Sequence, residues 1–200
     1  MRVAALFTVA LLSGCQQAAE PAPAPSATMS ASASAAPRPT STPLPKPTGK
    51  ALLDAEGAAF GPSASTVRRF AFGAAREEVE TAAEPVFGRP PIRSSNGECG
   101  ARPMDFSKFG ALTLNFQDGK LVGWLAESDP LVVTSDGIRP GTLFRDLAVA
   151  RSATMIEDST LEGEFDYLAA DGKTIGGFVT GSGRDARIRS LYAGVNCFFR

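Results

Sequence analysis

Residues 16–50 consist almost entirely of proline, alanine, serine and threonine, and this stretch limits where the chain can fold. It holds eight prolines, and Leu44 is its only large aliphatic residue. A segment with so few apolar side chains cannot bury a core, so we predict a disordered linker with some extended polyproline II character. The linker is either a spacer that reaches a partner or a simple tether. The globular part is then confined to residues 51–200, the size of one ordinary domain.

The first fifteen residues have the parts of an export signal. Arg2 supplies a positive charge, residues 3–12 form an apolar run, and residues 12–15 read Leu-Ser-Gly-Cys. A run of about ten residues is too short to cross roughly 30 Å of hydrocarbon as a helix. The Leu-Ser-Gly-Cys motif resembles the lipobox of bacterial lipoproteins. The alternative is an ordinary signal with a chance cysteine.

The lipobox resemblance implies a membrane-anchored chain. In that family the signal is removed before the cysteine, so residues 1–14 would be the signal peptide and residues 15–50 the anchor and linker. Cys15 would carry the lipid, and two or more acyl chains hold a protein stably at a membrane. Gln16 follows Cys15, where inner-membrane members of the family often have aspartate. The resemblance therefore favours the outer membrane, with the domain facing the periplasm.

Two cysteines, Cys99 and Cys197, remain after lipidation. An even pair in an exported protein indicates a disulfide, and two buried free thiols are the alternative. The chain has no histidine, so a catalytic thiol would lack its usual basic partner and a zinc site would lack ligands. A Ser-His-Asp arrangement and a Gly-rich phosphate loop are absent from the sequence too. We therefore expect no catalytic residue, no metal and no cofactor.

Apolar spacing predicts two helices in the domain. One is expected over residues 74–83 and the other from Thr142 to Ala150. Residues 51–69 are weakly patterned, and residues 92–105 form a predicted loop around Cys99. These assignments leave the remaining apolar segments for strands.

Two predicted β-hairpins stand out. Asp118-Gly119 lies between two runs of alternating apolar and polar residues, and Asp171-Gly172 lies between two more. Asp-Gly in this setting is a strong hairpin signal, because a type I′ turn needs positive φ at both positions. The eight residues that begin at Asp118 also match the eight that begin at Asp171, which favours an internal repeat.

The expected fold class is α+β, with two related modules after the disordered linker, each a helix packed on an antiparallel β-hairpin or sheet. Module one spans about 57–127 and module two about 131–200. Such a tandem unit is similar to the β-lactamase inhibitor protein and to the small lipoprotein of the outer-membrane β-barrel assembly machine. The likeness rests on pattern, including Gly73 to Val79 and Gly88-x-Pro90. It implies a non-enzymatic role in binding protein.

Three further features each allow two interpretations. Trp124 is either a core residue or an exposed anchor for a partner, since aromatic residues dominate binding hot spots. Three acids alternate on one predicted strand, either as its solvated face or as calcium ligands: Glu162, Glu164 and Asp166. Three arginines lie near the C-terminus, either as a solvated strand edge or as an anion site: Arg184, Arg187 and Arg189.

The overall charge bears on the class of partner. The formal net charge is −1, and it falls to −2 when Arg2 leaves with the signal. A chain with this charge balance lacks the excess of basic residues that is typical of nucleic-acid-binding proteins, so we expect no nucleic acid as a ligand. The expected function is an outer-membrane-anchored periplasmic lipoprotein that binds a protein or another envelope component without catalysis. The alternative is a histidine-free envelope hydrolase or a carbohydrate-binding lipoprotein.

Overall fold

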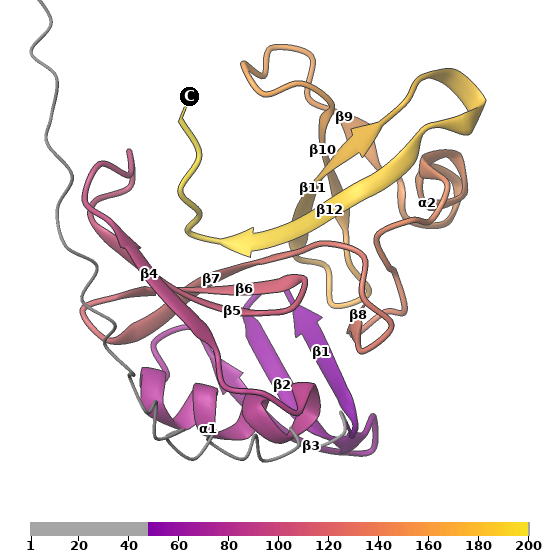
Figure 1. Cartoon of the computed structure of the whole chain (residues 1–200). Coiled ribbons are helices and arrows are strands. Elements are labelled where there is room, and N and C mark those ends of the chain that lie inside the picture. The colour runs from indigo at the N-terminus through magenta and orange to yellow at the C-terminus, as the bar shows by residue number, and fades with distance from the viewer. Residues whose placement is uncertain (1–47, 200) are drawn as a thin grey trace, which may run out of the picture. The chain divides into compact units, whose positions relative to one another are not determined.

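The computed structural model describes residues 48–199. In this range the backbone forms twelve strands, two α-helices and one 3₁₀ turn, arranged around a four-stranded and an eight-stranded sheet (Figure 1). The predicted signal peptide, Cys15 and the linker up to residue 47 lie outside the described residues. Among the described residues, no helix has both the length and the apolar character needed to cross a membrane.

The small sheet has the strand order β3-β2-β1-β8. Its strands are β1 (Lys50–Asp54), β2 (Gly57–Ser63), β3 (Thr66–Ala71) and β8 (Val132–Thr134). The first three form an antiparallel meander, and β8 pairs with β1 in parallel. Several of the side chains that the sheet buries are alanines, among them Ala51, Ala58 and Ala59. Alanine has low β-propensity, which is why this segment gives only a weak strand pattern in the sequence.

The large sheet has the strand order β4-β5-β6-β7-β12-β11-β10-β9, and all neighbours are antiparallel. Its strands are β4 (Ile92–Asn96), β5 (Met104–Phe109), β6 (Leu112–Gln117), β7 (Lys120–Ala126), β9 (Thr154–Met155), β10 (Glu164–Leu168), β11 (Thr174–Thr180) and β12 (Arg187–Gly194). The chain fills this sheet from both ends, so that β7 and β12 meet at its centre.

The prediction of a loop over residues 92–105 is wrong at both ends of this range. Ile92–Asn96 forms the edge strand β4, and Met104 begins β5. The sequence Ile-Arg-Ser-Ser-Asn of β4 shows no apolar alternation, and four of its five residues are exposed. The backbone ladder to β5, rather than side-chain burial, holds this strand in place.

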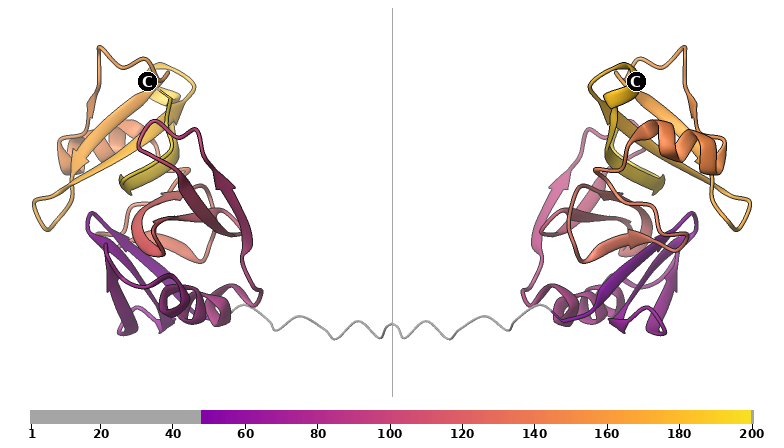
Figure 2. Two further views of the ribbon diagram at one scale, coloured as in Figure 1. Left: turned by 90° about the vertical axis from the view of Figure 1, so that its left-hand side faces the viewer. Right: turned by 90° about the vertical axis from the view of Figure 1, so that its right-hand side faces the viewer.

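Helix α1 (Arg76–Phe87) packs against strands of both sheets. Its buried face includes Val79, Ala83 and Phe87, and the helix ends at Gly88 with φ 64°, a left-handed position that suits glycine. Helix α2 (Phe144–Arg151) is shorter, buries only Leu147 fully, and lies against β10 and the 3₁₀ turn η1 (Gly183–Asp185). The side views show α1 and the small sheet together below the central strands, with β9 to β12 above them (Figure 2).

Trp124 lies in the core between the two sheets. Its side chain has 0% exposure, and the indole Nε1 donates a hydrogen bond to the Asp54 carbonyl of β1 at 2.8 Å. The ring therefore fills space and satisfies its polar atom without solvent. The interpretation of Trp124 as an exposed anchor for a partner is wrong, and the core alternative holds.

The predicted α+β class, with two modules of a helix on a hairpin, is wrong. The described chain is mostly β, with sheets of four and eight strands and only two α-helices. Helix α1 packs chiefly on the small sheet, which the prediction did not contain. The prediction missed β1, β2 and β4 because most of their residues are small or polar and the few large apolar ones give no clear period-two pattern.

Both Asp-Gly turns connect antiparallel strands, as predicted. Asp118 and Gly119 have φ values of 50° and 71° and join β6 to β7, which fits a type I′ turn. The segment containing Asp171 and Gly172 joins β10 to β11. In the consecutive strands β4 to β7, the first turn joins the last two, β6 and β7. In the consecutive strands β9 to β12, the second turn joins the middle two, β10 and β11. The two matching stretches therefore do not occupy equivalent places in the sheet.

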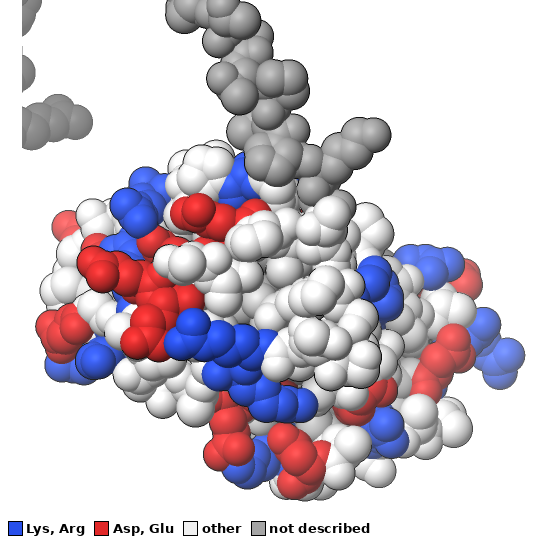
Figure 3. Space-filling model, turned by 90° about the horizontal axis from the view of Figure 1, so that it is seen from below, with Lys and Arg blue, Asp and Glu red and all other residues white. Residues whose placement is uncertain are grey.

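Charged side chains of both signs lie side by side on the face seen from below in Figure 3. Strand β3 also carries two ion pairs: Arg68 meets Glu78 at 2.9 Å, and Arg69 meets Asp54 at 2.8 Å. This face therefore offers no extended field of one sign to a polyanion.

Candidate functional site

The C-terminal residues cross the face of the large sheet that is turned away from the core. After β12 the chain turns back, and the Asn115 amide of β6 donates hydrogen bonds to the Val195 carbonyl at 3.0 Å and to Asn196 Oδ1 at 2.7 Å. Gly123 of β7 lies directly beneath, where a Cβ atom would stand 2.2 Å from the Val195 carbonyl oxygen. Only glycine at this position lets the terminal segment lie so close to the sheet.

A disulfide holds the terminal segment in place. Cys99, in the loop between β4 and β5, is bonded to Cys197, with their Cα atoms 5.0 Å apart. The disulfide predicted from the even cysteine pair is thus present. It joins residues 98 positions apart and fixes the C-terminal segment to the first half of the large sheet.

Three aromatic rings pack together beside this segment. Phe178 of β11 lies 5.4 Å from Tyr192 of β12, and Phe198 of the terminal segment lies 5.2 Å from Phe178 and 4.9 Å from Tyr192, measured between ring centroids. Gly176 makes room for this cluster, because a Cβ there would stand 2.3 Å from the Tyr192 ring. Edge-to-face packing of this kind stabilises the rings beyond their buried area.

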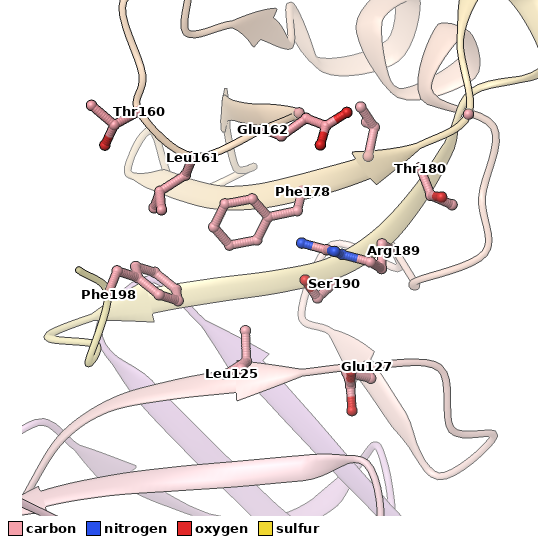
Figure 4. A pocket seen from close by; sticks show the side chains of 13 residues that line it. Leu125, Glu127, Thr160, Leu161, Glu162, Phe178, Thr180, Arg189, Ser190 and Phe198 are labelled. Carbon is pink, nitrogen blue, oxygen red and sulfur yellow. The ribbon is translucent and has the colours of Figure 1, made fainter. Parts of the chain in front are cut away.

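An open groove of about 550 Å³ runs along this cluster, where β7, β12 and β11 lie side by side (Figure 4). Its apolar lining includes Leu125 of β7, Leu161 of the loop before β10, Phe178 of β11 and Phe198 of the terminal segment, which are four separate parts of the chain. Grooves of this size with an apolar floor and a few polar groups are typical of binding sites.

The wall of the groove is the loop that precedes β10, and Glu164 anchors it. The carboxylate of this buried residue accepts hydrogen bonds from the Ser159 and Tyr192 hydroxyls. The backbone adds two bonds: Ile156 N donates to Glu164 O at 2.9 Å, and Val179 N donates to Gly163 O at 2.8 Å. These hydrogen bonds hold the loop in a fixed position against β10 and β11, so it forms a defined wall of the groove.

Three charged side chains face the groove. Arg189 of β12 lies over the Phe178 ring, with its guanidinium carbon 5.3 Å from the ring centroid, and Glu127 and Glu162 stand at the rim. Within residues 48–199, none of the three has an ion-pair partner within 4.0 Å. The cation–π contact fixes Arg189 while its donors remain open to a ligand.

The three predicted arginines separate in the structure. Arg189 lines the groove, whereas Arg187 donates to the Gly141 carbonyl at 2.9 Å and Arg184 belongs to the turn η1. They do not form one anion site, and only Arg189 contributes to the groove.

The three predicted acids separate too. Glu164 is engaged by hydroxyl groups, Asp166 accepts a hydrogen bond from Thr154 Oγ1 at 3.2 Å, and Glu162 lies at the groove rim. Over the described range, no three His, Cys, Asp or Glu side chains converge in a way that could hold a metal ion. The calcium interpretation of this row therefore finds no support.

A second buried carboxylate, Glu80 of α1, ties the helix to the large sheet. It accepts hydrogen bonds from Arg76 at 2.8 Å, from Arg93 of β4 and from the Ser107 hydroxyl of β5. Burial alone raises the pKa of Glu80, but these hydrogen bonds outweigh it and lower the pKa from 4.5 to about 2. Every partner is a protein group, so this cluster is structural rather than a ligand site.

The sequence did not single out the aromatic residues of the groove. Phe178 follows the pair Gly176-Gly177, and Phe198 follows Cys197. Two glycines beside an aromatic residue in a strand indicate close packing against that strand, and this signal could have pointed to Phe178. Arg189 lies over Phe178 because β11 pairs with β12, and this pairing is not visible in the local sequence.

Comparison of the chain with protein-family models, curated proteins and solved structures finds no match. The resemblances to lipoproteins and to tandem binding modules thus rest on the quoted residues alone.

Proposed function

We propose that this chain is a lipoprotein of the bacterial cell envelope, anchored through Cys15 in the outer membrane, and that its domain binds another envelope protein. The binding site in this proposal is the groove between β7, β12 and β11. The chain contributes recognition and no catalysis.

The anchoring part of the proposal rests on the Leu-Ser-Gly-Cys motif at residues 12–15 and on the apolar run before it. The Cys99–Cys197 disulfide supports an exported domain, because such bonds persist in oxidising compartments and are rare in the cytosol. The Pro-rich residues that follow Cys15 would let the domain reach a partner away from the lipid surface.

The binding part rests on one observation, the position of Arg189. An arginine stacked on an aromatic ring inside an apolar groove, without a carboxylate partner among the described residues, presents its donors to a bound molecule. Leu125 and Leu161 offer apolar contact beside it. Arginine and aromatic side chains around a desolvated pocket are the usual centre of a protein–protein interface.

The test is affinity isolation of the full-length lipidated protein from detergent-solubilised envelopes. We expect a stoichiometric protein partner that is lost, by about tenfold or more, in the groove variants Leu161→Arg and Arg189→Glu, since buried charge reversal costs several kcal/mol at an interface. The matched control is Arg145→Glu on the exposed face of α2, whose side chain is 52% exposed. Retention of the partner by both groove variants would contradict the proposal. So would the isolation of glycan in place of protein.

A further inference from the structure

Strand β4 is an open edge of the large sheet. It pairs with β5 on one side only, and Ile92 to Ser95 are all exposed. Within residues 48–199, no backbone hydrogen bond reaches its outer side. Because N–H and C=O groups alternate along a strand, about half of those in β4 point outward, where residues 48–199 supply no partner.

The other edges of the two sheets are shorter or protected. Strand β9 has two residues and β8 has three, too few to template a new strand. Strand β3 has six residues but carries two adjacent arginines, and charge on an edge discourages pairing. Five-residue β4 has a single charge, on Arg93, which pairs with Glu80 while its side chain stays 62% exposed. It is the least protected edge in the described part of the chain.

Strand β4 is also held rigid for pairing. Arg93 binds the buried Glu80 carboxylate, and Ser107, the residue of β5 directly opposite Arg93, donates to that carboxylate as well. The side chain of Asn96 reaches the Cys197 sulfur at 3.6 Å at the other end of the strand. An edge fixed at both ends loses little entropy when another strand binds to it.

We propose that β4 binds an extended segment of another protein, which adds to the large sheet as a ninth strand. Unpaired N–H and C=O groups at strand spacing select an extended polypeptide backbone over any other ligand. Ile92, which is 72% exposed, offers an apolar contact, and the opposite residue on β5, Lys108, has no ion pair among the described residues. The segment should therefore carry apolar residues in alternation, with acidic residues at its ends. This surface is separate from the groove and does not depend on it.

Two other occupants fit less well. In residues 16–50 of the same chain, the eight prolines lie within 21–25 and 37–47, where the missing N–H opposes strand pairing. Residues 26–36 hold no proline, but all of them except Met29 are serine, alanine or threonine, so they offer Ile92 little apolar contact. A second copy paired through β4 would bring only one apolar side chain, Ile92, from each edge, because the other four residues of the strand are polar. Such a pair would gain little from cross-strand packing.

The probe is a synthetic, end-capped peptide of sequence Asp-Val-Thr-Val-Thr-Val-Asp, titrated into the full chain by fluorescence anisotropy. Hydrogen exchange read by mass spectrometry then locates the bound peptide. We expect slower exchange over residues 92–96, and no binding by a control peptide whose central valine is proline. Ile92→Glu should weaken binding by about tenfold, whereas Val149→Glu, a matched change at a 90% exposed residue of α2, should leave it unchanged.

Proline variants test the backbone directly. Because N–H groups alternate, one of Ser94 and Ser95 points its N–H outward; proline there should abolish peptide binding while the melting temperature is kept. Three results would overturn the proposal: binding that survives Ile92→Glu, protection that appears outside β4, and binding of the proline control peptide. A dimer in sedimentation that Ile92→Glu dissociates would assign the edge to a second copy and overturn it too.

Discussion

Replacing Glu80 by glutamine removes the charge that joins α1 to β4 and β5 while keeping the side chain's size. The folded-state pKa of Glu80 lies at about 2 against an ordinary value of 4.5. At about 1.4 kcal/mol for each pKa unit, this depression corresponds to about 3 kcal/mol of folding free energy. The Glu80 side chain is only 3% exposed, but its partners Arg76 and Arg93 are 21% and 62% exposed, so about 3 kcal/mol is an upper figure once solvent screening is counted.

The direction of the pH effect follows from the sign of the shift. A carboxyl whose pKa is lower in the folded state stabilises the fold fully above pH 4.5. This contribution is lost as the pH falls from 4.5 toward 2. Below that range the native Glu80 is protonated and resembles glutamine. The native chain and the Glu80→Gln variant should therefore differ by up to about 3 kcal/mol at pH 7 and converge near pH 2.

Urea unfolding of the mature chain and the variant at pH 7, pH 4 and pH 2.5 measures this convergence. The control is Glu77→Gln, which removes an exposed acid from the first turn of the same helix and should change the unfolding free energy by no more than about 0.5 kcal/mol. A Glu80→Gln difference that stays constant between pH 7 and pH 2.5, or that is below about 1 kcal/mol at pH 7, would refute this reasoning.

Three further perturbations test other parts of the account. Replacing Cys99 and Cys197 by serine opens a loop of 98 residues and should lower the unfolding free energy by up to about 4–5 kcal/mol in urea titrations; an unchanged value would show that the disulfide does not restrain the unfolded chain. Gly176→Ala places a Cβ 2.3 Å from the Tyr192 ring, so near-ultraviolet circular dichroism should show a displaced tyrosine, and an unchanged spectrum with unchanged stability would contradict the close packing. Cys15→Ala should abolish acyl labelling and release the protein to the soluble fraction, and membrane retention with unchanged mobility would refute the anchor.

The sequence was sufficient for local features that depend on a few residues. The Asp118-Gly119 turn follows from the φ values that a type I′ turn requires, and the structure has both residues at positive φ. Gly88 ends α1 for the same reason, since a left-handed position favours glycine. The disulfide was predicted from an even number of remaining cysteines in a chain without histidine, and the structure has Cys99 bonded to Cys197.

The sheets could not be predicted, because their strands are stabilised by partners distant in sequence. Ala51 and Ala58 are buried in strands that pair with each other, with β8 beside β1 and α1 packed against both, and nothing in the local pattern shows this. Strand β4 is polar except for the exposed Ile92, and it exists because β5 pairs with it. The groove has the same origin: Leu125, Leu161 and Phe198 come together only when β7 and β12 meet.

Photocrosslinking in living cells tests the groove most directly. A photoreactive amino acid replaces Thr160, an exposed residue of the groove wall, in the full-length chain, and the control position is Asp146 on α2. The account predicts one discrete crosslinked protein from Thr160, its loss when Arg189→Glu is added, and no such product from Asp146. The absence of a product at Thr160, or the same product from Asp146, would contradict the proposed binding groove.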